Sequence, residues 1–205
     1  MQEAALCFEQ VNMENRKKYI KVHIIVEILL TIGLIASDQI TKLLAVRFLK
    51  GNSPFVLIDG VLELRYVENT GAAFGIFENK QWFFYIITVV IEIAVIIFIA
   101  LIFLKLKKYC RFCEVCAGTF SAKTYNDMIG LTYILAALFA GAAGNLIDRV
   151  ANRYVVDFIY FSIIDFPVFN FADILVTCSA VFLVIFFIFI YKEDKHLRLP
   201  GSKSD

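Results

Sequence analysis

The stretch WFFYIITVVIEIAVIIFIALIFL, from Trp82 to Leu104, decides the fold. It is a nearly unbroken run of apolar residues, and Glu92 is its single charged residue. A helix needs about 20 such residues to cross the hydrocarbon core of a bilayer. Backbone polar groups find no water inside lipid, so a segment of this kind is expected to be helical. The chain is therefore predicted to be a membrane protein.

The composition of the whole chain agrees with this prediction. Its mean hydropathy is +0.75, and 60% of its 205 residues are apolar while only 19% are charged. Soluble domains carry a larger share of charge. The formal net charge of +1 gives no electrostatic basis for binding nucleic acid, so we expect no nucleic-acid partner.

Three other segments are also apolar and long enough to cross a membrane. Together with the first, the predicted spans are Val22–Leu44, Trp82–Leu104, Met128–Ile147 and Phe171–Tyr191. The third span is rich in small residues, including Gly141 and Gly144, which permit close packing between helices. The predicted fold is an all-α membrane protein with four transmembrane helices.

The earliest of these spans has two interpretations. Four basic residues precede the apolar run 24–36, a pattern that is also typical of a secretory signal peptide. Apolar residues resume at Ile40 and continue to Val46, so a retained span is favoured. Residues 1–12 are polar and are expected to be dispensable.

Lys and Arg residues set the orientation, because they are enriched in the cytoplasmic segments of membrane proteins. Most of the 20 Lys and Arg residues precede the first span, follow the fourth, or lie between the second and third. The predicted organisation is a cytoplasmic amino-terminal segment (1–21), a four-helix membrane domain (22–191) and a cytoplasmic tail (192–205). The connections around residues 45–81 and 148–170 then face outward.

The first outward connection is predicted to contain β-structure. Apolar and charged residues alternate over residues 62–66, which is the pattern of a half-buried strand. Asp59 and Gly60 come just before it and suit a tight hairpin turn. We therefore expect a small extracytoplasmic β-hairpin or sheet beside the four helices.

Polar residues gather in five short motifs at the outward ends of the spans. They are SDQITK (37–42), ENTGAAFG (68–75), GNLIDR (144–149), VVDF (155–158) and FNFAD (169–173). Ionisable groups at membrane depth are costly, so their convergence at one level indicates a functional site.

The five motifs, in this order and at the ends of four spans, resemble those of lipoprotein signal peptidase, also called signal peptidase II. The resemblance covers nearly the whole membrane region and implies that residues 22–191 form a peptidase domain. It implies a membrane aspartyl endopeptidase that removes the signal peptide of a diacylglyceryl-modified prolipoprotein, cleaving just before the lipidated Cys. The expected location is the bacterial cytoplasmic (inner) membrane, with the active site on the extracytoplasmic side.

The same resemblance implies that Asp157 and Asp173 are the catalytic residues. Two carboxylates about 3 Å apart do not both ionise readily, so they share one proton. One can then act as a base toward water and the other as an acid toward the scissile carbonyl. The outward segments contain no Ser-His or Cys-His pairing, because His23 and His196 are expected on the cytoplasmic side.

Further polar residues of the motifs are expected to bind substrate or to support the aspartates. They are Asn69, Gly71, Asn145, Asp148, Arg149 and Asn170. Asp148 is also a rival for a catalytic role, although we favour a structural acid beside Arg149. Asn170 has a second interpretation as the N-cap of the fourth helix.

Asp38 and Lys42 are four residues apart on one helix, which is the spacing of an ion pair. A structural or lipid-headgroup role is favoured for them over direct substrate contact.

We expect membrane lipids and the prolipoprotein as partners, a monomer, no cofactor and no bound metal.

Two alternatives rest on other residues. A proton- or cation-coupled membrane transporter would use Glu92, the acid inside the second span. A membrane scaffold with a metal-binding loop would use Cys110, Cys113 and Cys116, although no His lies nearby to complete a tetrahedral site.

Overall fold

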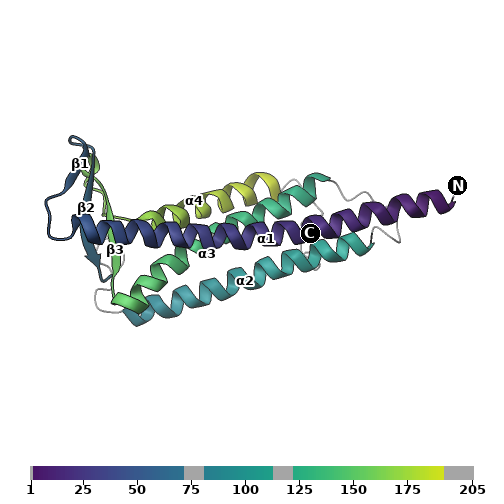
Figure 1. The fold of residues 1–205 in the computed structure, drawn as a ribbon, viewed down its shortest axis with the longest axis horizontal. Helices are drawn as coiled ribbons and strands as arrows, with labels where there is room; N and C mark the ends of the chain where they lie inside the picture. The colour runs from purple at the N-terminus through teal and green to yellow at the C-terminus, as the bar shows by residue number, and fades with distance from the viewer. Residues whose placement is uncertain (1, 72–80, 113–121, 192–205) are drawn as a thin grey trace, which may run out of the picture.

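The computed structural model describes residues 2–71, 81–112 and 122–191 of the chain (Figure 1). Its helices are α1 (Gln2–Leu49), α2 (Gln81–Phe112), α3 (Ala122–Asn152) and α4 (Phe171–Ile185), and a π-helical stretch, η3 (Phe186–Tyr191), continues α4. The four helices run along the long axis of the molecule, and a small sheet lies across one end of the bundle (Figure 1).

Each helix contains a segment that is long and apolar enough to cross a membrane. These segments are Lys18–Leu49, Tyr85–Lys107, Tyr125–Asn152 and Phe171–Ile190. They confirm the four predicted spans. The helices extend beyond the predicted limits because polar residues at the ends of the apolar runs continue the same helical backbone; α1 begins at Gln2 with no break near residue 21.

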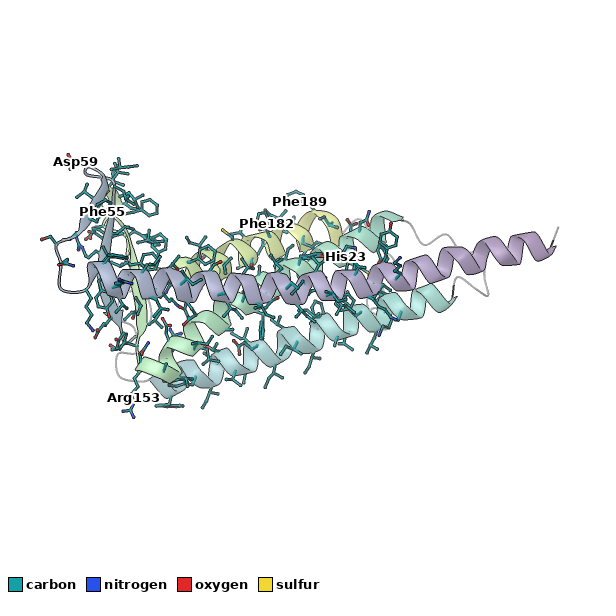
Figure 2. All side chains as sticks on the ribbon, viewed as in Figure 1. His23, Phe55, Asp59, Arg153, Phe182 and Phe189 are labelled. Carbon is teal, nitrogen blue, oxygen red and sulfur yellow. The ribbon has the colours of Figure 1, made fainter. Side chains whose placement is uncertain are left out.

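The surface of the bundle is strongly apolar along its length. Phe182 in α4 is 56% exposed and Phe189 in η3 is 64% exposed, and both side chains project away from the bundle (Figure 2). In water this surface would cost free energy, whereas lipid tails solvate it. The exposed apolar side chains therefore fit a bundle surrounded by lipid.

The sheet contains three antiparallel strands in the order β1 (Phe55–Ile58), β2 (Leu62–Asn69) and β3 (Val155–Phe161). The predicted hairpin between β1 and β2 is confirmed. Gly60 adopts φ +66° in its turn, and the Val61 N–H donates to the Ile58 carbonyl over 3.0 Å.

Strand β3 lies in the connection 148–170, for which no strand was predicted. Its residues pair with β2, and Val67 lies opposite Asp157 while Asn69 lies opposite Val155. Val155 and Val156 are β-branched and buried, which favours a strand once β2 is present to pair with it. This pairing brings Asp157 beside Asn69.

Helix α3 lies at the centre of the bundle and packs closely on α4. A Cβ atom built on Gly141 would lie 2.6 Å from the Ala172 carbonyl oxygen, and one on Gly144 would lie 2.5 Å from Asp38 Oδ2. The small residues predicted to allow close packing therefore do so, at the point where α3 passes α1 and the start of α4.

Candidate active site

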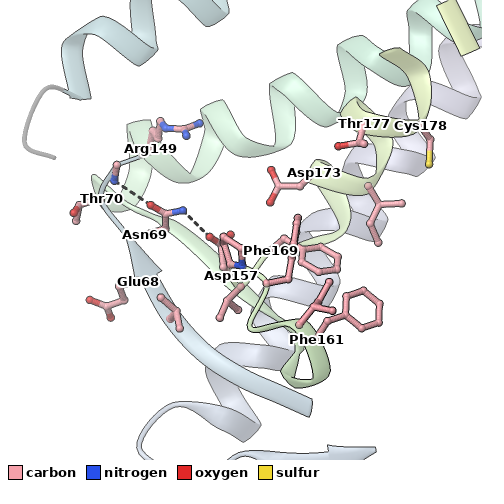
Figure 3. A pocket seen from close by; sticks show the side chains of 17 residues that line it. Glu68, Asn69, Thr70, Arg149, Asp157, Phe161, Phe169, Asp173, Thr177 and Cys178 are labelled. Carbon is pink, nitrogen blue, oxygen red and sulfur yellow. Dashed lines mark hydrogen bonds between the residues drawn. The ribbon is translucent and has the colours of Figure 1, made fainter. Parts of the chain in front are cut away.

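A cavity of about 930 Å³ opens at the end of the bundle next to the sheet. Its walls come from β2, β3, the end of α3 next to the sheet, the segment before α4, and α4 itself. Asp157 on β3 and Asp173 on α4 both line it (Figure 3). The fold thus brings the two predicted catalytic aspartates to one pocket.

Asp157 is 2% exposed, and both of its carboxylate oxygens accept hydrogen bonds. Asn69 Nδ2 donates to Oδ2 over 2.8 Å, and Asn170 Nδ2 donates to Oδ1 over 2.6 Å. The first of these contacts follows from the pairing of β2 with β3. The carboxyl group is therefore held in a fixed orientation toward the pocket.

The electrostatic environment of Asp157 differs from that of a carboxyl group in water. Burial, followed by the negative charge of Asp173, raises the pKa of Asp157 from 3.8 to about 7. The hydrogen bonds from Asn69 and Asn170 act in the opposite direction, but they are weaker effects. A carboxyl group with this pKa can hold a proton near neutral pH.

Asp173 lies in the first turn of α4 and forms a capping box with Asn170. The Asp173 N–H donates to Asn170 Oδ1 over 3.0 Å, and the Asn170 N–H donates to Asp173 Oδ2 over 3.1 Å. Asn145 Nδ2 donates to the other carboxylate oxygen, Oδ1, over 2.8 Å. The N–H donors at both oxygens and the start of the helix favour the anionic form of this carboxyl group, whereas its burial acts in the opposite direction.

Behind the pocket, four buried residues form a cluster of charged and amide groups. They are Asp38, Lys42, Asn145 and Asp148. Lys42 Nζ lies 2.8 Å from Asp38 Oδ2 and 3.1 Å from Asp148 Oδ2. The predicted pair of Asp38 and Lys42 is therefore present, and it is turned toward α3 rather than toward lipid. Asp38 Oδ1 also accepts from the Ala172 N–H over 2.9 Å, which links α1 to the start of α4.

Asp148 and Arg149 are neighbours in the sequence but occupy different places. Asp148 accepts a hydrogen bond from the Val156 N–H over 3.1 Å and is not part of the pocket wall. This contact ties α3 to β3, which supports a structural role. Arg149 lines the pocket, and its backbone carbonyl accepts a hydrogen bond from the Tyr85 hydroxyl of α2.

Asn69 is the last residue of β2 and Gly71 follows just beyond it, and both line the pocket. The Gly71 N–H donates to Asn69 Oδ1 over 3.0 Å, so the Nδ2 group of the same amide faces Asp157 (Figure 3). Gly71 thus orients Asn69 through its backbone. Residues 72–75, the rest of this motif, lie outside the described residues.

Several polar residues lie away from the pocket. Glu92 in α2 and Glu27 in α1 each have one buried carboxyl oxygen without a hydrogen-bond partner in the described part of the chain, and neither lines the pocket. His23 Nδ1 lies 3.0 Å from the Tyr133 hydroxyl, and His196 is outside the described residues.

The cysteine run falls largely outside the described structure. Cys113 and Cys116 lie in the segment 113–121, and only the backbone of Cys110, near the end of α2, is described. Among residues 2–71, 81–112 and 122–191, no group of three or more His, Cys, Asp or Glu side chains is arranged to hold a metal ion.

The sequence did not predict the apolar and neutral residues that complete the pocket. These include Phe161, Ile164, Phe166, Phe169, Thr177 and Cys178. Thr177 and Cys178 follow Asp173 along α4, so the pocket continues beside that helix in the direction of the bundle (Figure 3). The four-residue spacing between Asp173 and Thr177 was the available signal, because residues four apart share a helix face.

The family model described as Signal peptidase (SPase) II matches residues 30–189. A lipoprotein signal peptidase of Clostridium tetani (strain Massachusetts / E88) is 38% identical over 170 residues, which cover 82% of this chain and 92% of that protein.

Two solved structures, both described as bacterial membrane enzymes determined by the in meso method, have a similar fold. One, at 2.3 Å resolution, has a TM-score of 0.61 and 29% identity and covers 87% of this chain and 94% of its own. The other, at 1.9 Å resolution, has a TM-score of 0.59 and 30% identity over 80% of this chain and 94% of its own. The chain belongs to the signal peptidase II family and is a membrane protease.

Proposed function

We propose that this protein is an aspartyl endopeptidase that removes the signal peptide of diacylglyceryl-modified prolipoproteins, cutting just before the lipidated Cys. Membership of the signal peptidase II family supports the substrate class. The observation that carries the proposed mechanism is the presence of Asp157 and Asp173 in one pocket, where burial and the charge of Asp173 raise the pKa of Asp157 to about 7.

The two aspartates have different roles in this mechanism. Asp173, stabilised as an anion by its capping contacts, accepts a proton from water as the water oxygen attacks the scissile carbonyl carbon. Asp157 holds the proton of the pair and donates it to the carbonyl oxygen. As the tetrahedral intermediate collapses, the C–N bond breaks and the leaving amine takes the proton from Asp173. One hydroxyl group of the intermediate returns its proton to Asp157 as the C=O bond forms again, which restores the starting state of the pair.

Neutral and cationic donors around the pair assist this chemistry. Asn69 and Asn170 orient Asp157 through two hydrogen bonds, and Arg149 lines the same pocket. A guanidinium group can donate to the peptide backbone, or to the oxygen on which negative charge develops, without itself titrating. Arg149 is therefore assigned to substrate binding and charge stabilisation.

The remaining walls suit a substrate with apolar groups. Phe161, Ile164, Phe166 and Phe169 line the pocket, and Ile174 continues the apolar wall along α4. Acyl chains and the apolar part of a signal peptide can pack against these side chains without being exposed to water, which is favourable for apolar groups. These residues are proposed to hold the lipid-modified segment while the aspartates reach the bond beside it.

The proposed orientation places the sheet and the pocket on the extracytoplasmic side and both termini in the cytoplasm. The distribution of Lys and Arg supports it. The protein is also proposed to act as a monomer, because a single chain supplies both aspartates and the amides that hold them.

An in vitro cleavage assay tests the proposed substrate. The purified protein in detergent or vesicles is given the same prolipoprotein with and without the diacylglyceryl group on its Cys. Cleavage before the Cys of the lipidated precursor, with little or none of the unlipidated one, is the expected result. Equal cleavage of both, or of neither, contradicts the proposal.

A further inference from the structure

Lys42 lies behind the pocket, and all of its hydrogen-bonding capacity is used inside the protein. Nζ donates to Asn145 Oδ1 over 2.8 Å and pairs with Asp38 at 2.8 Å and with Asp148 at 3.1 Å. An ammonium group has three N–H donors, so these three acceptors use them all. The side chain is 3% exposed and does not line the pocket. Lys42 therefore acts on other residues of the protein rather than on a substrate.

The residue through which Lys42 can reach the active site is Asn145. A side-chain amide has an acceptor end and a donor end. Oδ1 of Asn145 accepts from Lys42 and, over 3.1 Å, from Asn170 Nδ2. Its Nδ2 end consequently faces Asp173 and donates to Oδ1 over 2.8 Å. Rotating the amide by half a turn would point its NH₂ group at two other donors and its oxygen at a carboxylate, which is strongly unfavourable.

We propose that Lys42 is a positioning residue that fixes the orientation of the Asn145 amide and, through it, the carboxylate of Asp173. The inference rests on the proposed function, because it concerns how Asp173 is held for the reaction. Asp38 and Asp148 keep the ammonium group in place from two sides. Lys42 thus connects α1 to the aspartate of α4 without entering the pocket.

The charge of Lys42 provides a second, independent effect that can be measured. Its ammonium group lowers the pKa of Asp157, in opposition to burial and to Asp173. The other charged residues around the aspartate pair are Asp38 on α1, Asp148 and Arg149 on α3, and Glu68 on β2. Removing the positive charge of Lys42 leaves an excess of acids, so the pKa of Asp157 should rise.

The test uses the full-length Lys42→Met variant and the lipidated precursor. We expect kcat to fall roughly 100-fold, as for a catalytic group that is displaced by about 1 Å, while KM stays unchanged. The alkaline limb of the pH profile should also move to higher pH, because the pKa of Asp157 is then higher and the carboxyl group stays protonated up to a higher pH. A lysine with only a structural role would lower the folded fraction and leave this limb in place.

A double-mutant cycle tests whether Lys42 acts on Asp173 through Asn145. The losses caused by Lys42→Met and Asn145→Ala should overlap, because both remove the same restraint on Asp173. The losses from Lys42→Met and Asn69→Ala should multiply, since Asn69 contacts Asp157 instead. Lys21→Met is the matched control: Lys21 is an exposed lysine of the same helix, far along α1 from Lys42 and away from the pocket, so its loss should leave kcat and the pH profile unchanged.

A variant that leaves two acids unpaired can fail to fold. In that case the Asp38→Asn/Lys42→Met pair removes both charges together, and Asn at position 38 keeps an oxygen for the Ala172 N–H. It should fold and show the same loss of kcat. The inference is overturned if a folded Lys42 variant keeps the kcat of the wild-type protein. It is also overturned if the losses of Lys42→Met and Asn145→Ala multiply in the double variant. In both cases the proposed function stands as long as the wild-type protein cleaves the lipidated precursor. Failure of the wild-type protein to cleave the lipidated precursor overturns both.

Discussion

Asn170 donates a hydrogen bond to Asp157 over 2.6 Å, from a side chain that is fully buried. The opposite end of the same amide accepts from the Asp173 N–H over 3.0 Å and caps α4. The two interpretations of Asn170, as N-cap and as active-site amide, are therefore compatible in one geometry. The start of α4 and the orientation of Asp157 depend on the same side chain.

Substitutions at Asn170 should separate these two contributions. Asn170→Ala removes the cap, which costs about 0.5–2 kcal/mol of stability, and removes the donor to Asp157, so cleavage should fall sharply. Asn170→Ser retains a capping oxygen but has no amide donor for Asp157. It should recover most of the thermal stability, measured in detergent, and little of the activity. Full activity in the Ser variant would show that the contact with Asp157 has no role in catalysis.

The sequence was sufficient to predict the helices and the hairpin because their signals are local. A long apolar run such as Trp82–Leu104 has no alternative to a helix in lipid, and Asp59 with Gly60 before an alternating segment favours a hairpin. The motif at 169–173 likewise indicated the start of α4, since Asn170 was a candidate N-cap. The structure adds that Asp173 completes a capping box with it.

The arrangement of the site could not be predicted from local patterns. Asp38 accepts a hydrogen bond from the backbone of Ala172, 134 residues later, and Asp157 gains its contact with Asn69 only when β3 pairs with β2. Such contacts depend on how the helices and strands pack in three dimensions. For Lys42, spacing predicted the ion pair with Asp38 but not the hydrogen bond to Asn145 on α3.

The raised pKa of Asp157 predicts how activity depends on pH. Asp157 must be protonated to act as the acid, and its pKa is raised to about 7. The value of kcat/KM should therefore fall as pH rises through about 7, because the proton is lost from the pair. A pH series of initial cleavage rates measures this limb. Activity that continues to rise well above pH 7 would exclude the assigned role of Asp157.

Cys178 offers a chemical probe of the pocket. It is a free cysteine on α4 that is exposed and lines the cavity near Thr177. In a variant whose other four cysteines are replaced by Ser, alkylation of Cys178 should block cleavage in proportion to the fraction of protein labelled, because the added group fills the pocket. Labelling is measured by mass spectrometry. The same background with Cys178→Ala should stay active after treatment, and full activity of the labelled protein would place the substrate elsewhere.

Two glycines of α3 test the close packing that supports the site. A Cβ at position 144 would lie 2.5 Å from Asp38 Oδ2, whereas one at position 130 would meet nothing within 4 Å. Gly144→Ala should therefore displace Asp38 and destabilise the protein by roughly 1–3 kcal/mol, as overpacking does. Gly130→Ala should be neutral or stabilising, because Ala favours helix more than Gly by about 1 kcal/mol. Thermal unfolding of both variants in detergent measures the difference; equal midpoints would contradict the packing of α3 on α1.

Single substitutions of the two aspartates test the central claim most directly. Asp157→Asn and Asp173→Asn each remove one carboxyl group with little change in shape, and Asp165→Asn is the matched control. Asp165 is an exposed acid that accepts from the Tyr160 hydroxyl, and Asn readily adopts its φ of 47°. Cleavage of the lipidated precursor by each folded, membrane-inserted variant is the measurement. The account predicts no detectable cleavage by the first two variants and normal cleavage by the third; normal cleavage by either Asp157→Asn or Asp173→Asn would contradict it.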